Sequence, residues 1–398
     1  MREFSKVIVS KRATKRLMYM HPFVYDNEVE KIIGDYKNGD LVDVLNYKEK
    51  YIGTGFINNN SKLFVRLISW NTNDIFDEDF FERRVKYAIE YRLSVMESLD
   101  SVRLIFGDAD FFPGLTIDKY NNILVSEITT LGIEIRKDLI YKLIIKLLDS
   151  FGYKIDGIYE RCDSSLRDRE GLPKISGFYE KFGIPNYDET IIEENGIKYI
   201  VDFKNGQKTG FFLDQKFNRL AIRKVCKDKN VLDVCTCTGS FGFNAYVAGA
   251  KRVVSVDISQ SSLEVAKRNA SLNGFDIKYV QSDAFDFLEN ITKGEFDTII
   301  LDPPAFTKSR KTVKNASTGY EELNYLAMKK LKRGGFLVTC SCSHFMNDNL
   351  FLENILKAAK KANVELRVIE ARHQSMDHPI LLNVEETSYL KFYIFQIV

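Results

Sequence analysis

The sequence has little of several features that would place it in a specialised class. Its 398 residues contain six cysteines, too few for a disulfide scaffold. No apolar run approaches the length of about 18 residues that a membrane span needs. The amino terminus is charged from its second residue and lacks the apolar stretch of a secretory signal. These absences predict a cytoplasmic protein without a membrane partner.

Net charge is also nearly absent, because 57 Lys and Arg against 55 Asp and Glu leave a charge of +2. As a total, this value argues against a nucleic-acid partner. The charge is segregated, however, into three basic segments: residues 1–20, 216–229 and 308–333. Each alone is compatible with a solvated face, but phosphate contacts need local rather than net positive charge. The distribution therefore favours a polyanion partner that binds steeply less well as salt rises.

Three regions can be distinguished along the chain. Residues 1–72 contain short β-prone runs separated by turn residues, which predicts a small β-barrel. Residues 73–200 open with an amphipathic helix over 80–93 and continue as a mixed α+β domain. Residues 201–398 alternate strand-like and helical runs, which predicts an α/β domain with a mostly parallel sheet. We find no internal repeat and no low-complexity segment.

The alternation in the third region locates its elements. Strands are predicted over 231–234, 252–256, 277–280, 298–301 and 336–340. Helices are predicted over 259–273, 321–331 and 348–361. In open sheets of this kind ligands bind beyond the carboxyl ends of the strands, so the residues that follow each strand are the candidate site.

Three successive strand ends carry acids. Asp233 precedes a loop of small residues ending at Gly239, Asp257 follows the next strand, and Asp283 follows the third. The loop lacks the G-x-G-x-x-G pattern that a dinucleotide pyrophosphate requires. A carboxylate at the second strand end can accept hydrogen bonds from both hydroxyls of a ribose. The pattern thus predicts a nucleoside with a cationic tail, which S-adenosylmethionine fits and NAD does not.

The fourth and fifth strand ends carry the candidate chemistry. Asp302 is followed by Pro303 and Pro304, which make a rigid wall, and then by Phe306. The fifth strand ends near Cys340 and Cys342, of which the second lies past the strand end, where catalytic groups sit in such folds. The two C-x-C pairs, Cys235/Cys237 and Cys340/Cys342, lack the spacing of structural zinc sites, so no metal is predicted.

These motifs resemble the ribosomal RNA large-subunit methyltransferase I family over nearly the whole chain. His21-Pro22-Phe23-Val24-Tyr25 resembles the entry of the family's RNA-binding PUA domain, and residues 106–118 resemble its central domain. Residues 207–215 match the segment that packs over the cofactor in this family, and Asp377-His378-Pro379 matches the carboxyl-terminal end. Cys235-Thr236-Cys237 in the first loop departs from the family's more usual Phe-Cys-Tyr.

The resemblance implies a fold and a cofactor. The fold would be a Rossmann-like class I methyltransferase domain with a mostly parallel seven-stranded sheet, preceded by a PUA-like β-barrel and an α+β central domain. The cofactor would be S-adenosyl-L-methionine, with S-adenosylhomocysteine as the product, and Asp257 would hold the ribose and Asp283 the adenine. The implied cofactor-binding residues are Lys208, Thr209, Gly210, Phe211, Phe212, Asp214, Gln215, Asn218, Arg219, Asp233, Cys235, Thr238, Gly239, Asp257, Ile258, Asn273, Asp283, Ala284, Asp302 and Pro303.

The resemblance also implies a reaction. It selects Cys342 over Cys340 as the nucleophile for cytosine-5 methylation of large-subunit (23S) ribosomal RNA, with Asp302 as an acid contact to the base. The substrate-binding residues would be Pro304, Phe306, Lys308, Arg310, Lys311 and His378, and the two basic segments of the third region would lie beside the active site. A homodimer is compatible with the family.

Two other functions remain open at this point. A methyltransferase with the same scaffold could modify guanine or adenine nitrogens of ribosomal or transfer RNA, which needs no thiol. The chain could also be a non-catalytic RNA-binding module, although this leaves the ordered strand-end motifs unexplained.

Overall fold

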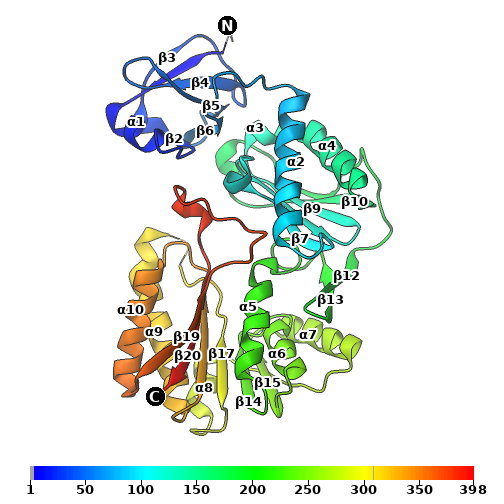
Figure 1. Cartoon of the computed structure of the whole chain (residues 1–398), viewed down its shortest axis with the longest axis vertical. Helices are drawn as coiled ribbons and strands as arrows, with labels where there is room; N and C mark the ends of the chain where they lie inside the picture. The colour runs from blue at the N-terminus through cyan, green and yellow to red at the C-terminus, as the bar shows by residue number, and fades with distance from the viewer. Residues whose placement is uncertain (1–3, 308) are drawn as a thin grey trace. The chain divides into compact units, whose positions relative to one another are not determined.

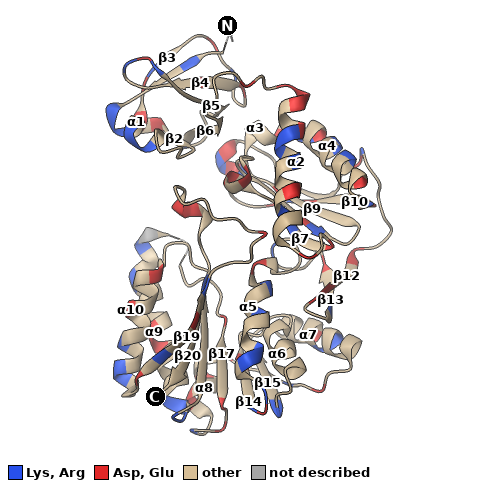
Figure 2. Ribbon diagram, viewed as in Figure 1, with Lys and Arg blue, Asp and Glu red and all other residues tan. Residues whose placement is uncertain are grey.

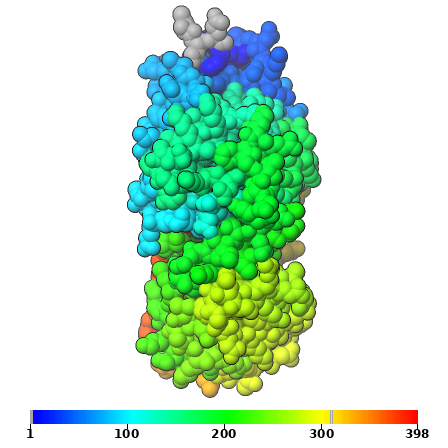
Figure 3. Space-filling view, turned by 90° about the vertical axis from the view of Figure 1, so that its right-hand side faces the viewer, coloured from blue at the N-terminus to red at the C-terminus, as the bar shows by residue number. Residues whose placement is uncertain are grey.

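The computed structural model describes residues 4–307 and 309–398, apart from the side chain of Arg310. Residues whose placement is uncertain are grey in Figures 1, 2 and 3. The chain divides into two compact units. The first consists of Met1–Ile192, Val201–Leu213 and Met376–Thr387, and the second of Glu193–Ile200, Asp214–Ser375 and Ser388–Val398.

The amino-terminal sheet of the first unit has six strands in the order β2-β6-β5-β4-β1-β3. Only β1 and β4 pair in parallel; the other neighbours are antiparallel. Ala13 and Leu17 of helix α1 are buried in the core of this sheet, so the helix exposes its basic side to solvent. The elements are β1 (Lys6–Val9), α1 (Lys11–Leu17), β2 (Phe23–Tyr25), β3 (Val29–Ile33), β4 (Leu41–Leu45), β5 (Tyr51–Ile57) and β6 (Leu63–Ser69).

The second sheet of the first unit has five strands in the order β11-β10-β9-β8-β7. Helix α4 connects β9 to β10, which pair in parallel, and α2 packs against α4 (Figure 1). This mixed arrangement is the α+β region that the sequence predicts. The elements are α2 (Glu78–Val95), β7 (Ser101–Phe106), β8 (Leu115–Tyr120), β9 (Ile123–Ile128), α3 (Leu131–Glu134), α4 (Lys137–Ser150), β10 (Gly157–Cys162) and β11 (Ile175–Phe178).

Two strands, β12 (Glu189–Glu194) and β13 (Ile197–Asp202), form a sheet of their own, and the second unit is built on a seven-stranded sheet. Its order is β16-β15-β14-β17-β18-β20-β19, and the first five strands are parallel. Strand β20 is antiparallel to both β18 and β19. The strands are β14 (Asn230–Val234), β15 (Arg252–Asp257), β16 (Lys278–Gln281), β17 (Thr298–Leu301), β18 (Phe336–Ser341), β19 (Leu366–Arg372) and β20 (Lys391–Ile397).

Three helices of the second unit, α7, α8 and α10, begin at a capping side chain. Ser259 caps α7 by accepting a hydrogen bond from the Ser262 amide, and Asn347 caps α10 in the same way from Leu350. The helix α7 ends at Gly274, whose φ of +68° suits glycine. The helices are α5 (Lys216–Ala221), α6 (Ser240–Val247), α7 (Gln260–Asn273), α8 (Ala284–Asn290), α9 (Val313–Lys330) and α10 (Asp348–Ala362).

The helix predicted over residues 321–331 is wrong at its amino end, since α9 spans Val313–Lys330. Ala316 and Tyr320 are buried and continue the apolar face toward the amino terminus. The polar, lysine-containing sequence around Gly319 conceals this continuation. A Cβ at Gly319 would lie 3.1 Å from the ring of Phe306, so the glycine lets the helix approach that residue closely. No described helix is long and apolar enough to cross a membrane.

Candidate active site

The carboxyl ends of β14–β18 form one edge of the second unit's sheet, as the strand-helix alternation predicts. The strand register aligns the last residues of these strands. The positions at their ends therefore form one row across the sheet, which reads Gln281, Asp257, Cys235, Asp302 and Cys340. Acids that are far apart in the sequence are thus neighbours at this edge.

The acids at this edge lie around the loop that follows β14. Burial raises the pKa of the Cys235 thiol above its ordinary value, and the charges of Asp257, Asp302, Asp233 and Asp283 raise it further. The four predicted carboxylates therefore act on one side chain. Such a concentration of negative charge favours a ligand that carries positive charge.

Asp233 is fully buried beneath the loop and fixes its shape. Its Oδ2 accepts hydrogen bonds from the Thr236 hydroxyl at 2.5 Å and the Gly242 amide at 2.9 Å, and its Oδ1 has no hydrogen-bond partner among the described residues. Burial raises the pKa of Asp233 to about 7. At Gly242 a Cβ would lie 3.1 Å from Oδ2, and φ at Gly239 is +88°, so both glycines allow the tight turn.

Asp257 ties the first loop to the second. Its Oδ2 accepts a hydrogen bond from the Cys237 amide and its Oδ1 accepts one from the Ser259 amide, each at 2.9 Å. The carboxylate therefore lies between the loop after β14 and the start of α7. Ile258, the next residue, is 67% exposed.

Asp283 and Asn273 have clear structural partners. Asp283 caps α8, which begins at Ala284, by accepting a hydrogen bond from the Phe285 amide at 2.8 Å. Asn273 donates to and accepts from the backbone of Lys198. The geometry therefore connects Asn273 with the β13 segment, and its predicted role in cofactor binding stays a prediction.

Asp302 lies beneath the segment that follows Asp214. Its Oδ1 accepts a hydrogen bond from Gln215 Nε2 at 3.1 Å, and Asn218 Nδ2 donates to Gln215 Oε1 at 2.7 Å. Burial raises the pKa of Asp302 to about 7, and the charge of Asp214 contributes in the same direction. A carboxyl group with this pKa is able to donate as well as accept a hydrogen bond near neutral pH.

Two further residues of the predicted cofactor site, Arg219 and Thr238, form contacts next to the loop after β14. Arg219 is 1% exposed and donates to both carboxylate oxygens of Glu194 at 2.6 and 2.8 Å. The carbonyl of Thr238 accepts a hydrogen bond from Asn269 of α7 at 3.3 Å. Both contacts hold segments of the second unit next to the loop around Gly239.

The segment predicted to form a rigid wall after β17 lies next to the end of β18, where the two cysteines are found. Pro303 is buried, Pro304 is exposed, and the Phe306 ring lies 4.6 Å from the Tyr320 ring, measured between centroids. Cys340 is fully buried in β18, and burial raises the pKa of its thiol well above the ordinary value. Cys342 follows the end of the strand and is partly exposed.

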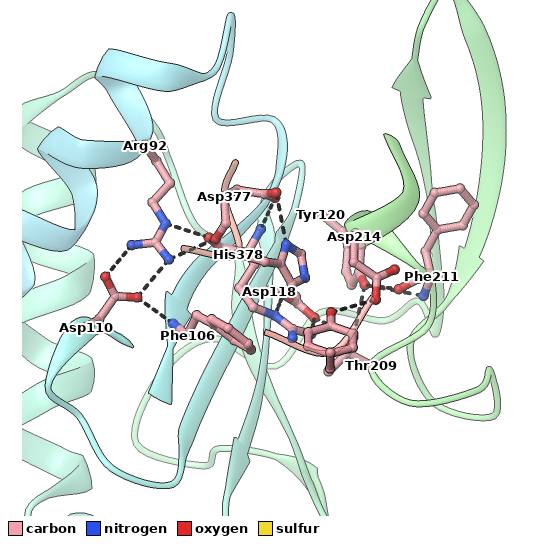
Figure 4. Close-up of polar contacts among 12 residues, drawn as sticks. Arg92, Phe106, Asp110, Asp118, Tyr120, Thr209, Phe211, Asp214, Asp377 and His378 are labelled. Carbon is pink, nitrogen blue, oxygen red and sulfur yellow. Dashed lines mark hydrogen bonds and ion pairs between the residues drawn. The ribbon is translucent and has the colours of Figure 1, made fainter. Parts of the chain in front are cut away.

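Several predicted residues belong to the first unit. Thr209 donates a hydrogen bond to Asp118 at 2.5 Å and shares one of 3.0 Å with Tyr120, whose hydroxyl also donates to the Phe211 carbonyl (Figure 4). Lys208 lies over the ring of Phe212, 4.8 Å from its centroid, and φ at the neighbouring Gly210 is +125°. What these residues contribute to cofactor binding stays a prediction.

The predicted substrate residue His378 is also buried in the first unit. Its Nδ1 lies 2.9 Å from Asp377 Oδ1, and its ring lies against Phe106. Arg92 bridges Asp110 and the Asp377 carbonyl, so the segment around His378 is fixed to α2 and β7 (Figure 4). This network has the character of a structural anchor.

The structure corrects the placement of part of the two basic segments. Lys227 and Lys229 precede β14, and Lys332 and Arg333 precede β18, so these four residues lie toward the amino edge of the sheet, opposite the candidate site. Proximity to a strand in the sequence does not show that a charged residue borders the site. Residues that precede a parallel strand lie at the opposite edge of the sheet from residues that follow it. Of the predicted substrate cations, Lys311 is exposed, Lys308 lies outside the described residues, and the side chain of Arg310 is not described.

Sequence reasoning assigned no role to Glu194, Tyr320 and Lys391. Lys391 is 2% exposed and donates to the Ser343 carbonyl beside Cys342, and Tyr320 shares a hydrogen bond with the Ser343 hydroxyl. All three come from elements distant in sequence. No local motif marks Glu194 or Tyr320, and Lys391 belongs to the Tyr389-Leu390-Lys391 segment that resembles the family's carboxyl-terminal end. Among the described residues, no group of three or more His, Cys, Asp or Glu side chains could hold a metal ion.

The parallel sheet and the strand-end acids fit a nucleoside cofactor with a cationic group, since carboxylates converge on a glycine-containing loop. Together the fold and the site define the class of the protein: an S-adenosylmethionine-dependent methyltransferase. Residues 181–396 match the family model described as S-adenosylmethionine-dependent methyltransferase, and residues 7–70 match a PUA-like domain. The predicted fold class and cofactor are thereby confirmed.

Relatives with similar sequences identify the family within this class. The ribosomal RNA large subunit methyltransferase I of Aeromonas salmonicida (strain A449) is 38% identical over 392 residues, 97% of each chain. The protein of that name from Cronobacter sakazakii (strain ATCC BAA-894) is 35% identical over 393 residues, 97% of this chain and 98% of its own. The chain belongs to the ribosomal RNA large subunit methyltransferase I family, which confirms the resemblance of its motifs.

Solved structures agree on the fold. The crystal structure of SMU.776 complexed with SAH has a TM-score of 0.82 at 22% identity, covering 98% of this chain and 99% of that one. A SAM-dependent methyltransferase structure from Streptococcus mutans has a TM-score of 0.80 with the same identity and coverage.

Proposed function

We propose that this protein methylates C5 of a cytosine in large-subunit ribosomal RNA, with Cys342 as a covalent nucleophile. The observation that carries the proposal is the contrast between Cys340 in β18 and Cys342 just after it. Cys340 is fully buried with a strongly raised thiol pKa, whereas Cys342 is partly exposed just past the strand end. A nucleophilic thiol must reach its substrate, and of these two cysteines Cys342 is the one placed to do so.

The chemistry needs a nucleophile because cytosine C5 is not reactive enough to accept a methyl group directly. The Cys342 thiolate adds to C6, so that an S–C6 bond forms and the electron pair of the C5–C6 double bond becomes available at C5. The cofactor, when bound, supplies the electrophilic methyl group. A base then removes the C5 proton, the double bond is restored and the thiolate leaves.

Asp302 is placed to assist this addition. With a pKa of about 7, its carboxyl group can donate a hydrogen bond to the N3 edge of the ring as negative charge develops there. Gln215 orients the same carboxyl group through its 3.1 Å hydrogen bond. Phe306 and Pro304 offer surfaces for a base that has left its helix or loop.

The strand-end acids give the cofactor its proposed contacts. Asp257 would hold the ribose hydroxyls, Asp283 the adenine, and the loop after Asp233 the methionine end. The exposed basic side of α1 and the PUA-like domain would hold the surrounding RNA. The three-part domain division, a homodimer and a cytoplasmic location remain predictions.

The experiment incubates the protein and cofactor with 5-fluorocytosine-substituted ribosomal RNA, which blocks loss of the C5 substituent and traps a covalent complex. We expect an RNA adduct whose mass maps to Cys342, that disappears in Cys342→Ser and persists in the matched control Cys340→Ala. If Cys342→Ala methylates RNA at the full rate, the covalent mechanism is wrong. In that case methylation at a guanine or adenine nitrogen becomes the favoured reaction, and nucleoside analysis of the product identifies the atom.

A further inference from the structure

Lys391 opens β20, and its buried side chain reaches the loop that carries Cys342. It is 2% exposed, and its Nζ donates hydrogen bonds of 2.7 Å to the carbonyls of Ser343 and Tyr389. In the sheet, Lys391 pairs with Ser341, the last residue of β18. Burying an ammonium group is costly, so a lysine at this position requires a compensating interaction.

The electrostatics couple Lys391 to the thiol. Burial lowers the pKa of Lys391 to about 8, whereas the charges of Asp348 and Cys342 act to raise it. The interaction between two titrating groups is mutual, so an ammonium at Lys391 stabilises a thiolate at Cys342 by the same energy.

Among the described residues, Tyr320, Cys340 and Asp348 do not supply positive charge to this loop. Burial raises the pKa of Tyr320 to about 12 and that of Cys340 well above its ordinary value, so both are neutral near pH 7. Asp348, at the start of α10, is an acidic residue that accepts a hydrogen bond from Tyr393 at 2.9 Å. His344, which follows Ser343, has an exposed side chain.

We propose that Lys391 is a positioning residue for the methyl-transfer reaction: its ammonium group fixes the Ser343 carbonyl and holds Cys342 in the thiolate form. The proposal rests on the proposed cysteine mechanism and adds the group that activates the nucleophile. When Cys342 ionises, its proton passes to the Lys391 amine or to solvent. The sulfur keeps the electron pair that later forms the S–C6 bond.

The test measures the alkylation rate of Cys342 by iodoacetamide as a function of pH, resolved by peptide mass spectrometry. This readout needs no RNA, so it separates failure of this proposal from failure of the proposed function. We expect the wild-type profile to have its midpoint below about 8.5, the value of an ordinary cysteine. Cys237, which lies on another loop and whose thiol pKa burial raises to about 12, serves as an unreactive internal reference.

Two variants at position 391 separate charge from packing. Lys391→Gln keeps a donor for the carbonyls but removes the charge; we expect the alkylation rate of Cys342 at pH 7 to fall by about tenfold and the midpoint to rise by about one pH unit. Lys391→Arg should restore the wild-type profile. Lys357→Gln, which removes an exposed lysine from α10, is the matched control and should change nothing.

The same variants connect the thiol to catalysis. In methylation assays, Lys391→Gln should lower kcat with little change in KM, and the acid limb of the pH–rate profile should move upward with the alkylation midpoint. An unchanged alkylation profile in folded Lys391→Gln overturns the proposal, even if methylation falls. If neither variant folds, a wild-type midpoint at or above about 8.5 has the same consequence.

Discussion

Glu194 accepts two hydrogen bonds from Arg219, at 2.6 and 2.8 Å, and both side chains are only 1% exposed. This ion pair fixes α5 to the end of β12 within the second unit. Arg219 also lies 3.5 Å from the Ser240 hydroxyl at the start of α6, so the pair supports the loop that the strand-end acids surround.

The first prediction concerns this ion pair. Glu194→Gln should lower the free energy of unfolding by about 3–5 kcal/mol, because it leaves the Arg219 charge buried without a counter-ion. Urea unfolding followed by circular dichroism measures the change. The exposed neighbour Glu193 provides the control, since Glu193→Gln should have an effect below about 0.5 kcal/mol. Equal effects of the two substitutions would show that the buried pair adds no stability.

The second prediction concerns the ionisation of Asp302. Its folded-state pKa of about 7 lies above the ordinary value of 3.8, so the folded state binds a proton more tightly than the unfolded state. Stability should therefore fall as pH rises from about 4 to about 7. Asp302→Asn removes this loss and should exceed the wild type at pH 8 by about 2 kcal/mol. That is less than the roughly 4 kcal/mol the full difference in pKa implies, because the side chain is partly exposed.

Thermal unfolding of the cofactor-free protein at pH 4.5 and pH 8 checks this dependence. The gain of Asp302→Asn over the wild type should be present at pH 8 and nearly absent at pH 4.5. A gain of the same size at both values would show that packing, and not ionisation, is responsible.

The third prediction concerns the cofactor. Asp257→Ala should weaken S-adenosylmethionine binding by more than tenfold in calorimetry, because under the proposed assignment the ribose loses its acceptor, and the Cys237 and Ser259 amides lose theirs. Asp257→Asn, which keeps one acceptor oxygen, should bind with intermediate affinity. The matched control is the exposed Asp276, whose substitution by Ala should leave affinity unchanged. Wild-type affinity in folded Asp257→Ala would refute the ribose assignment.

The fourth prediction concerns RNA. Lys11, Arg12 and Lys15 are exposed on α1, where Figure 2 shows basic residues gathered. Replacing all three by Gln should weaken binding of ribosomal RNA fragments and reduce the slope of log K against log salt by about 2, since each phosphate contact contributes about 0.7 to 0.9.

The control for this measurement removes cations that already have partners. Lys142 and Lys146 on α4 are exposed but form ion pairs with Glu78 and Glu82. Their replacement by Gln should leave the salt slope nearly unchanged. An equal reduction by both sets of substitutions would indicate general charge rather than a binding surface on α1.

The strands of the second unit could be predicted well because their apolar runs are short and bounded by polar residues. The run at 231–234 became β14, and the run at 298–301 became β17. The start of α9 could not be predicted, because Gly319 and its polar neighbours conceal an apolar face that only the packing of Ala316 and Tyr320 makes visible. Nothing in the sequences of β19 and β20 indicates that β20 lies between β18 and β19.

The net charge is close to zero, but the order of residues shows where the acids lie. They follow successive parallel strands, and the ends of those strands share one edge of a sheet. The sequence by itself therefore determined that Asp233, Asp257 and Asp302 would meet. Only the tertiary structure decided which charges accompany them. It turned Lys227 and Arg333 toward the opposite edge, and it inserted β20 antiparallel beside β18, which brings Lys391 to the carbonyl of Ser343, the residue after Cys342. Pairing between distant strands depends on the packing of the whole sheet, which no local pattern encodes.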